Sequence, residues 1–392
     1  MDRKIKADYL IIGGGIFGCS TAYNLANQGA KNIIVIEMGG ICSGGTSKSC
    51  AISRSHYTIE SNVQHAVESL KVFENFEEII GGDSGFVSTG QIVLGPENFR
   101  KVMESVFHTQ NKYGSETQTL TKEEARILHP LLKLDDVDVI GFELHSGYCD
   151  PYLTTTAYFK RAKDLGVKFY TDTKVTDISQ IGLIKNLKTA KGIFESPNLI
   201  FAAGPWTRGL GQMIGIKFPF EISKHKVFSL KIDKPYKKNW PIVKDLLTPE
   251  KIYFRPDSGG LVLVGTGDKG DLVNNIDEIT DDVEMEHVER IGKRISHRMP
   301  VFENAKLVRS WTGMYDIPPD WNPIIGAVPN YEGIYVGVGF SGHGFKSAPT
   351  MGEAFAQKIL GHEPQIPIEM YCMSRFESGK TLNGAYGIGT FA

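Results

Sequence analysis

The chain of 392 residues lacks several features that mark common classes of protein. Its apolar runs are strand-sized, and no stretch approaches the roughly 18 apolar residues that a membrane span needs. The N-terminus enters its first expected strand too early to hold a signal peptide, so we expect a cytoplasmic protein without a membrane span. A net charge of -2 and the absence of a long basic run argue against nucleic acid or an anionic membrane as a partner.

Cysteine is also scarce. The five cysteines include no C-x-x-C pair, and an odd number without such a pair predicts neither a disulfide framework nor a zinc site. We therefore expect no bound metal, and most of the cysteines should be small buried hydrophobic residues. Glycine is abundant by contrast, with 43 residues that cluster at 13–18, 39–45 and 333–344. These three clusters are candidate walls of a ligand site, because glycine lets backbone approach a ligand closely.

Residues 7–37 have the pattern of a dinucleotide-binding βαβ unit. An apolar strand at 9–12 runs into a turn with the G-x-G-x-x-G spacing, which lets the backbone approach a pyrophosphate. Apolar residues then recur at helical spacing, so the N-terminal N–H groups of a helix should face the phosphates. A second buried strand at 33–36 ends at Glu37, whose carboxylate can accept both hydroxyls of an adenosine ribose. The glycines of the turn are Gly13, Gly15 and Gly18.

Residues 39–57 are small, polar and rich in hydroxyl groups, which predicts a loop that wraps a cofactor. The segment resembles the loop after the second strand in FAD-dependent enzymes of the D-amino-acid oxidase superfamily, specifically the sarcosine oxidase branch. The resemblance implies that FAD is the cofactor. It also implies that Arg54, three residues before Tyr57, binds a substrate carboxylate, whereas the alternative for Arg54 is a surface cation.

The second segment that carries the resemblance, residues 311–360, contains WTGMYDIPPDWNPIIG and YVGVGFSGHGFKSAPTMGEAFAQKIL. A strand at 334–338 should meet the loop GFSGHGF and then a helix whose N-terminus faces a ligand. Its partial positive charge would stabilise the negative charge near N1 and the C2 carbonyl of a reduced flavin. The resemblance implies that Lys346 pairs with Arg54 on the substrate carboxylate, and a surface lysine is the alternative.

Three positions depart from the patterns of this superfamily. Tyr315 stands where glycine oxidase and D-amino-acid oxidase place a carboxylate-binding arginine, so their mode of substrate binding is disfavoured. Gly313 stands where monomeric sarcosine oxidase attaches its flavin through a cysteine, so we expect non-covalent FAD. The strand LVLV at 261–264 lacks the lysine that promotes the reaction with oxygen in that enzyme, and the electron acceptor is therefore open.

The sequence and the resemblance together imply an α/β protein with an α+β second domain. The first domain is a discontinuous, Rossmann-like FAD-binding domain with a central parallel sheet, at 1–80, 146–220 and 305–365. A substrate domain with a large antiparallel or mixed sheet takes 81–145 and 221–304, and a C-terminal tail takes 366–392. Strands at 221–231 and 252–266, the latter broken by DSGG, would form a roof over the flavin.

The candidate site residues come from all these segments. Val175 in TKVTDI resembles the second adenine-contacting strand of the family. AAGPW at 202–206 resembles the turn beneath the pyrophosphate, although a plain tight turn is an alternative. Tyr253 or His225 would face the pocket from the roof, unless they are packed core residues. The catalytic candidates are Arg54, Lys346, Tyr253 and Tyr315, and the cofactor-binding candidates are Gly13, Gly15, Ile16, Phe17, Gly18, Glu37, Ser43, Thr46, Ser47, Val175, Ala203, Gly204, Trp206, Gly313, Gly342, His343, Gly344, Phe345 and Lys346.

The resemblance implies the oxidation of a secondary-amine amino acid, such as sarcosine or proline, to an imine by hydride transfer to flavin N5. One alternative is a dehydrogenase that resembles the β subunit of L-proline dehydrogenase complexes and passes electrons to a partner subunit, and a homo-oligomer is also open. Another is a flavin electron-relay subunit without its own substrate, against which the pair Arg54 and Lys346 argues. A module that only binds a ligand is disfavoured, because a buried cation pair costs stability unless an anion binds it.

Overall fold

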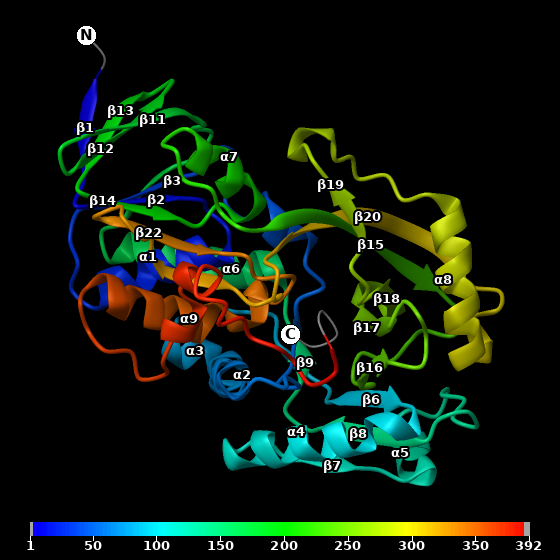
Figure 1. Cartoon of the computed structure of the whole chain (residues 1–392). Helices are drawn as coiled ribbons and strands as arrows, with labels where there is room; N and C mark the ends of the chain where they lie inside the picture. Colours follow the sequence, from blue (N-terminus) through cyan, green and yellow to red (C-terminus); the bar gives the residue numbers. More distant parts are fainter. Residues whose placement is uncertain (1–2, 388–392) are drawn as a thin grey trace.

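The computed structural model describes residues 3–387, and its two main parts lie side by side (Figure 1). The first part is built on a six-stranded sheet with the order β10-β3-β2-β14-β22-β21. Its strands are parallel except for β21, which pairs antiparallel with β22. The strands are β2 (Tyr9–Ile12), β3 (Ile33–Ile36), β10 (Lys168–Tyr170), β14 (Asn198–Phe201), β21 (Ile324–Ala327) and β22 (Ile334–Val338).

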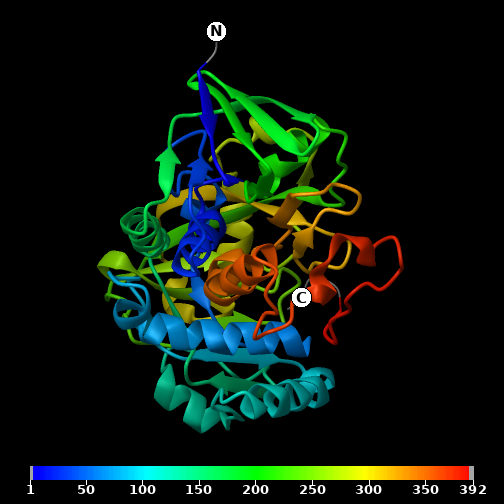
Figure 2. The same cartoon turned by 90° about the vertical axis from the view of Figure 1, so that its left-hand side faces the viewer.

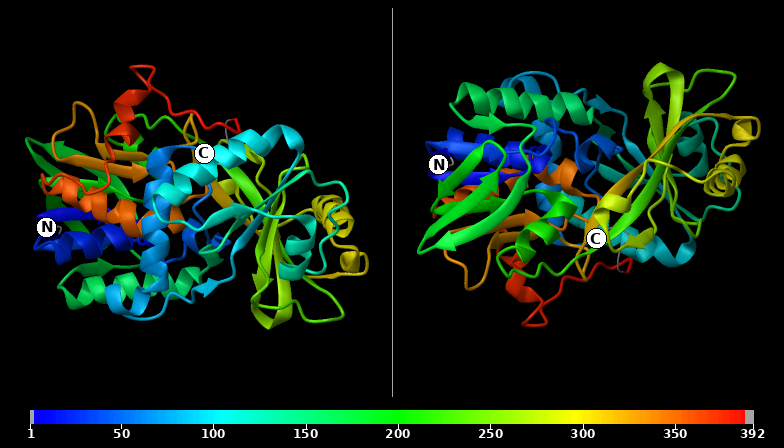
Figure 3. Two further views of the ribbon diagram at one scale, coloured as in Figure 1. Left: turned by 90° about the horizontal axis from the view of Figure 1, so that it is seen from below. Right: turned by 90° about the horizontal axis from the view of Figure 1, so that it is seen from above.

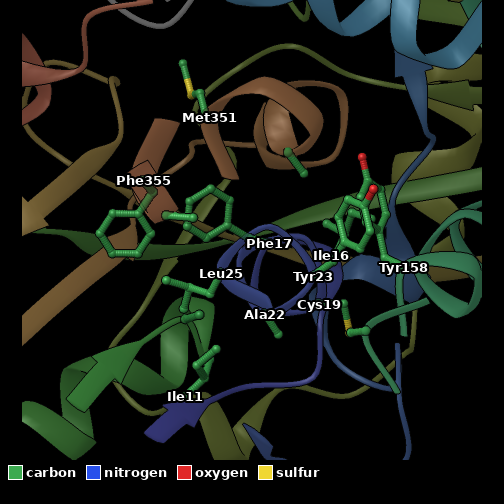
Figure 4. Close-up of a cluster of buried hydrophobic side chains, with 14 of the residues drawn as sticks. Ile11, Ile16, Phe17, Cys19, Ala22, Tyr23, Leu25, Tyr158, Met351 and Phe355 are labelled. Carbon is green, nitrogen blue, oxygen red and sulfur yellow. The ribbon is translucent and has the colours of Figure 1, made fainter. Parts of the chain in front are cut away.

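Helices cover one face of this sheet, where α1 (Ile16–Asn27) contacts both α6 (Pro151–Asp164) and α9 (Gly344–Ile359). Phe17 of α1 packs against Phe355 of α9 with ring centroids 5.7 Å apart, and Tyr23 meets Tyr158 of α6 at 5.6 Å (Figure 4). The central strands are nearly continuous apolar runs because parallel strands of this kind are buried on both faces.

A four-stranded sheet covers the other face, with the order β1-β13-β12-β11. Phe194 and Leu187 of this sheet share a buried cluster with Leu10 and Ile34 of the central sheet. The strands are β1 (Lys4–Lys6), β11 (Val175–Ile181), β12 (Ile184–Thr189) and β13 (Gly192–Ser196). Of these four strands only the one that begins at Val175 was expected, because the others are short and half exposed and carry a weak apolar pattern.

The second part is built on a nine-stranded sheet with the path β19-β15-β18-β17-β16-β6-β8-β7, and β20 pairs with β15. The sheet is mixed, because β16 and β6 are parallel while the neighbouring pairs are antiparallel. Its strands are β6 (Gln91–Gly95), β7 (Thr117–Thr119), β8 (Val139–Glu143), β15 (Glu221–Lys231), β16 (Ile242–Asp245), β17 (Tyr253–Asp257), β18 (Leu261–Gly265), β19 (Asp271–Val273) and β20 (Lys306–Ile317).

Helix α8 (Met285–Arg298) packs on the nine-stranded sheet at the end of the molecule opposite the N-terminus (Figure 3). Helix α2 (Glu60–Glu74) contacts both α9 and α4 (Arg100–Lys112), and so connects the two parts (Figure 2). The remaining helices and strands are α3 (Phe76–Ile79), α5 (Lys122–Leu128), α7 (Thr207–Gln212), β4 (Ile52–Ser53), β5 (Val87–Ser88) and β9 (Gly147–Tyr148).

The predicted α/β fold class is confirmed, as are the strands at 9–12, 33–36, 221–231 and 334–338. β20 falls inside the range 305–365 assigned to the FAD-binding domain, yet it pairs along its length with β15 of the nine-stranded sheet. Across residues 3–387, no helix is long and apolar enough to cross a membrane. The same residues contain no group of three or more metal-ligating side chains suited to a metal ion.

Candidate active site

A cavity of about 680 Å³ is lined by residues of both the central sheet and the nine-stranded sheet. One end is bounded by the glycine turn after β2 and by Glu37, and the other end is bounded by β15, β16 and β17. Nearly all of the candidate residues from the sequence line this cavity. They are Gly13, Gly15, Ile16, Phe17, Glu37, Thr46, Arg54, Val175, Ala203, Gly204, Trp206, Tyr253, Gly313, Tyr315, Gly342, His343, Gly344, Phe345 and Lys346.

The glycine turn is held in place by tight backbone packing. Gly13 has φ +118, and a Cβ on it would lie 2.3 Å from the carbonyl oxygen of Ala202. Gly18 does not line the cavity, but a Cβ there would lie 2.1 Å from the oxygen of Gly13. Its role is therefore the close packing of α1 on the strand, while Gly15 begins the helix at the cavity wall.

Three candidates differ from expectation. Besides Gly18, Ser43 and Ser47 lie outside the cavity lining, and the hydroxyl of Ser47 donates to the carbonyl of Gly44 at 2.9 Å. Thr46 faces inward instead and accepts from the N–H of Ile16 at 3.1 Å. The 3-10 turn at Gly45–Lys48 explains the difference, because successive residues on such a turn point in different directions.

Glu37 is fixed at the end of β3 by two backbone donors. Its Oε2 accepts from the N–H of Gly14 at 2.6 Å, and its Oε1 accepts from the N–H of Gly39 at 2.8 Å. A carboxylate oxygen has more than one lone pair, so these bonds orient the group and still leave acceptor capacity toward the cavity. The position and chemistry of Glu37 fit a ribose with two hydroxyls.

The structure brings Arg54 and Lys346 into the same cavity, although 291 residues separate them in the chain. Lys346 lies in the first turn of α9 and is buried. Burial and the neighbouring charges of Arg54 and Lys244 lower the pKa of Lys346 well below its ordinary value. Arg54 donates to the carbonyl of His56, and its guanidinium lies 4.5 Å from the ring centroid of Tyr57. An anion bound between the two cations would favour the charged form of Lys346.

Aromatic residues of the nine-stranded sheet form the wall opposite α9. His225 on β15 stacks on Tyr315 of β20 with ring centroids 3.6 Å apart, and burial lowers the pKa of His225 to about 3. The hydroxyl of Tyr253 lies 3.1 Å from the Sγ of Cys50, and burial raises the pKa of Tyr253 well above its ordinary value. These rings are therefore uncharged near neutral pH, and both Tyr253 and His225 line the cavity.

The loop before α9 needs glycine at the point where it meets this wall. Gly342 has φ +82, and a Cβ there would lie 2.3 Å from the Cζ of Tyr315. Gly342 and the first residues of α9 line the cavity, so the N-terminus of a 16-residue helix faces the space between the two sheets. The partial positive charge of such a terminus suits an electron-rich ring atom.

Sequence reasoning missed Lys244 of β16, which also lines the cavity. Its Nζ donates to the carbonyl of Lys251 at 2.7 Å, and burial, with the charge of Arg54 next, lowers the pKa of Lys244 to about 7. The resemblance to monomeric sarcosine oxidase directs attention to 261–264, where β18 has no lysine. The feature of the sequence that could have identified Lys244 is a lysine within the mostly apolar segment WPIVKDLL.

Cys50 lines the cavity, and its Sγ lies 3.1 Å from the hydroxyl of Tyr253. Cys19, Cys42 and Cys149 are buried as expected. The cavity as a whole fits an extended dinucleotide, with a ribose acceptor at one end, a glycine turn beside it and a helix N-terminus farther along.

Comparison with known proteins agrees with this geometry. The family model for FAD-dependent oxidoreductases, DAO, matches residues 8–358. Sarcosine oxidase subunit beta of Rhizobium meliloti (strain 1021) is 26% identical over 391 residues, which cover 96% of this chain and 90% of the relative. The human mitochondrial sarcosine dehydrogenase is 25% identical over 392 residues, which cover 96% of this chain and 42% of that enzyme. The crystal structure of L-proline dehydrogenase from P. horikoshii superposes with a TM-score of 0.88 at 29% identity, covering 96% of this chain and 99% of the other.

Proposed function

Because this chain belongs to the DAO family of FAD-dependent oxidoreductases, we propose that it oxidises a secondary-amine amino acid to the imine by hydride transfer to flavin N5. The observation that carries the proposal is the meeting of Arg54 and Lys346 in the cavity that the glycine turn and Glu37 also line. Two cations near one carboxylate form charge-assisted hydrogen bonds, and these are stronger in a buried site than in water. Sarcosine, proline and other N-alkyl amino acids are the proposed substrates.

The residues fit FAD, bound without a covalent link. Glu37 would hold the adenosine ribose, Gly13 and Gly15 would approach the pyrophosphate, and the N-terminus of α9 would face the isoalloxazine ring. When bound, FAD supplies the ring that accepts the hydride. Gly313 has no side chain for attachment, and this supports the non-covalent state.

The chain's own residues bind and orient the substrate. Arg54 and Lys346 would hold the carboxylate, and the position of that carboxylate would fix where the α-carbon lies. Tyr253, His225 and Tyr315 provide a buried, uncharged wall that excludes water from the amine. Exclusion of water strengthens the interaction of the carboxylate with both cations.

The electron acceptor is proposed from two observations. β18 has no lysine, and the chain resembles an L-proline dehydrogenase and a sarcosine oxidase β subunit. We therefore favour transfer of electrons to a partner subunit over reaction with oxygen.

We also propose a cytoplasmic location and a discontinuous division of the chain into a FAD-binding domain and a substrate domain. β20 is placed in the substrate domain because it pairs with β15.

The test is anaerobic reduction of the purified yellow protein by a panel of amino acids that includes sarcosine, proline and pipecolate. Bleaching of the flavin band by at least one of them, but not by its carboxamide, supports the proposal. Air is then admitted, and slow reoxidation with rapid reoxidation by an artificial electron acceptor supports a dehydrogenase. If no N-alkyl amino acid bleaches the flavin, the proposed activity is wrong and the electron-relay subunit becomes the better assignment.

A further inference from the structure

Lys244 occupies an unusual place for a lysine. It lies in β16 between Val243 and Asp245, every residue of this strand is buried, and its side chain reaches the cavity. In register it pairs with Tyr253 of β17, and its Nζ lies 5.3 Å from the ring centroid of that tyrosine. Lysine is rarely this deeply buried unless its charge is paired.

Two contacts fix where the ammonium group lies. Nζ donates to the carbonyl of Lys251 at 2.7 Å, and a Cβ on Gly267 would lie only 2.1 Å from the same Nζ. A side chain at position 267 would clash with Nζ of Lys244, and the glycine leaves this space open. Both Gly267 and Lys244 line the cavity, so the position of this charge is built into its wall.

Six lysine and arginine side chains line the cavity, namely Lys48, Arg54, Lys174, Arg208, Lys244 and Lys346. Three of them, Arg54, Lys346 and Lys244, form one group. They act on one another, since the charges of Arg54 and Lys244 both lower the pKa of Lys346, and Arg54 lowers that of Lys244. Lys251 adds to this repulsion at Lys244, while Asp268 and Asp245 oppose it. Collecting like charges in a buried site costs stability, and bound anions offset that cost.

The proposed function uses Arg54 and Lys346 for one carboxylate, and Lys244 adds a further basic group from β16, in the wall that the nine-stranded sheet forms. Building on the proposed function, we propose that Lys244 binds a second carboxylate of the substrate. The preferred substrates are then N-alkyl amino acids with an acidic side chain or an acidic N-substituent. If Lys244 served only to hydrogen-bond the carbonyl of Lys251, the enzyme would show no preference for a substrate with a second carboxylate.

The test compares matched acids and amides by anaerobic flavin reduction. N-methyl-L-glutamate is paired with N-methyl-L-glutamine, and N-methyl-L-aspartate with N-methyl-L-asparagine, so each pair differs mainly in one charge. A charge-assisted bond is worth about ten- to hundred-fold, and we expect kcat/KM of the wild type to favour the acid by that factor. A ratio within about twofold in the wild type overturns the inference.

Substitutions of Lys244 test whether this residue causes the preference for the acid over the amide. Lys244→Met should bring the acid-to-amide ratio within about twofold, whereas Lys244→Arg should retain a preference for the acid. Lys226→Met is the matched control, because Lys226 on β15 pairs with Asp271 and Glu284, both at 2.9 Å, and should leave the ratio unchanged. A ratio that persists in Lys244→Met overturns the role of Lys244.

A second measurement separates this inference from the proposed function. Glutarate and its mono-amide are added to the FAD-loaded protein, and the unfolding temperature is recorded. Glutarate should raise that temperature more than the mono-amide in the wild type and not in Lys244→Met, because a ligand that binds the native state stabilises it. If no amino acid bleaches the flavin, the proposed activity fails while the glutarate shift still tests Lys244. If substrates bleach the flavin and glutarate gives no larger shift than its mono-amide, the second-carboxylate site alone fails.

Discussion

The carboxylate of Glu143 lies 2.8 Å from Nδ1 of His56, and both side chains are fully buried. Glu143 ends β8 of the nine-stranded sheet, and its Oε2 also accepts from the N–H of Ser55 at 3.2 Å and from the hydroxyl of Ser146 at 2.8 Å. Arg54 in turn donates to the carbonyl of His56. Glu143 therefore anchors the backbone that follows Arg54 and thereby orients the guanidinium in the cavity.

We predict that Glu143→Gln lowers the stability of the protein and raises KM more than it lowers kcat. The glutamine has one acceptor oxygen in place of two, so a buried donor is left poorly paired at a cost of about 1 to 3 kcal/mol, and a displaced Arg54 would bind the carboxylate less well. Unfolding temperature and steady-state kinetics measure the two effects. Glu97→Gln, which removes an exposed carboxylate, is the control and should change neither quantity appreciably.

The effect of Glu143→Gln on stability should depend on pH. Burial alone would raise the pKa of Glu143, but the hydrogen bond and charge of His56, with Ser146 and Arg54, lower it below its ordinary value. A lowered pKa contributes stability above the unfolded-state value of about 4.3, and this contribution is lost as pH falls through the folded-state value. The difference in unfolding temperature between wild type and variant should therefore shrink below about pH 4.3. A constant difference at every pH would contradict the pairing.

Arg54→Ala and Lys346→Ala should each lower kcat/KM by about ten- to hundred-fold, since each removes a charge-assisted bond to the same carboxylate. The loss in the double variant should differ from the sum of the single losses, because the two cations share one partner. Lys358→Ala, at the exposed end of the same helix α9, is the control. Values within about twofold of wild type for both single variants would remove the basis of the substrate assignment.

Glu37→Ala should weaken the retention of FAD more than it alters the turnover of enzyme refilled with FAD. Glu37 accepts from Gly14 and Gly39 at the end of β3, and its proposed partner is the ribose, which takes no part in the hydride transfer. The absorbance ratio of flavin to protein after gel filtration measures retention, and turnover is measured in excess FAD. Glu77→Ala, an exposed acid on α3, is the control. Equal flavin content in the variant and the wild type would contradict the ribose assignment.

Acid precipitation should release the yellow colour into the supernatant, because Gly313 offers no attachment atom. A yellow pellet would show a covalent flavin. Cys50 is then the first residue to replace, since its thiol lines the cavity, and loss of the pellet colour in Cys50→Ser would identify the link.

The fold could be predicted where the decisive information is local. The glycine spacing, the apolar strands at 9–12 and 33–36, and Glu37 at the end of the second strand specify a βαβ unit within about thirty residues. The capping box that Thr121 and Glu124 form at the start of α5 is another local signal of this kind. The hairpin around DSGG also follows from its own turn residues.

Pairing between distant strands could not be predicted in this way. β20 lies within the segment 305–365 that was assigned to the FAD-binding domain, yet it adds to the nine-stranded sheet through β15, about ninety residues earlier. β16 lies beside β6, about 150 residues earlier in the chain. No local pattern specifies such neighbours, because several edges of similar apolar character are available to a short strand.

For the same reason, local motifs suffice to recognise residues that suit a dinucleotide, whereas the set of charged side chains that meet in the cavity depends on how distant strands pair. Arg54 and Lys346 were recognisable from their motifs, but nothing in WPIVKDLL shows that Lys244 reaches the same cavity. That depends on the position of β16 between β6 and β17, which turns one side chain of a buried strand toward Arg54. Electrostatic interaction acts through space, so the three cations become one site only after the two sheets face each other across the cavity.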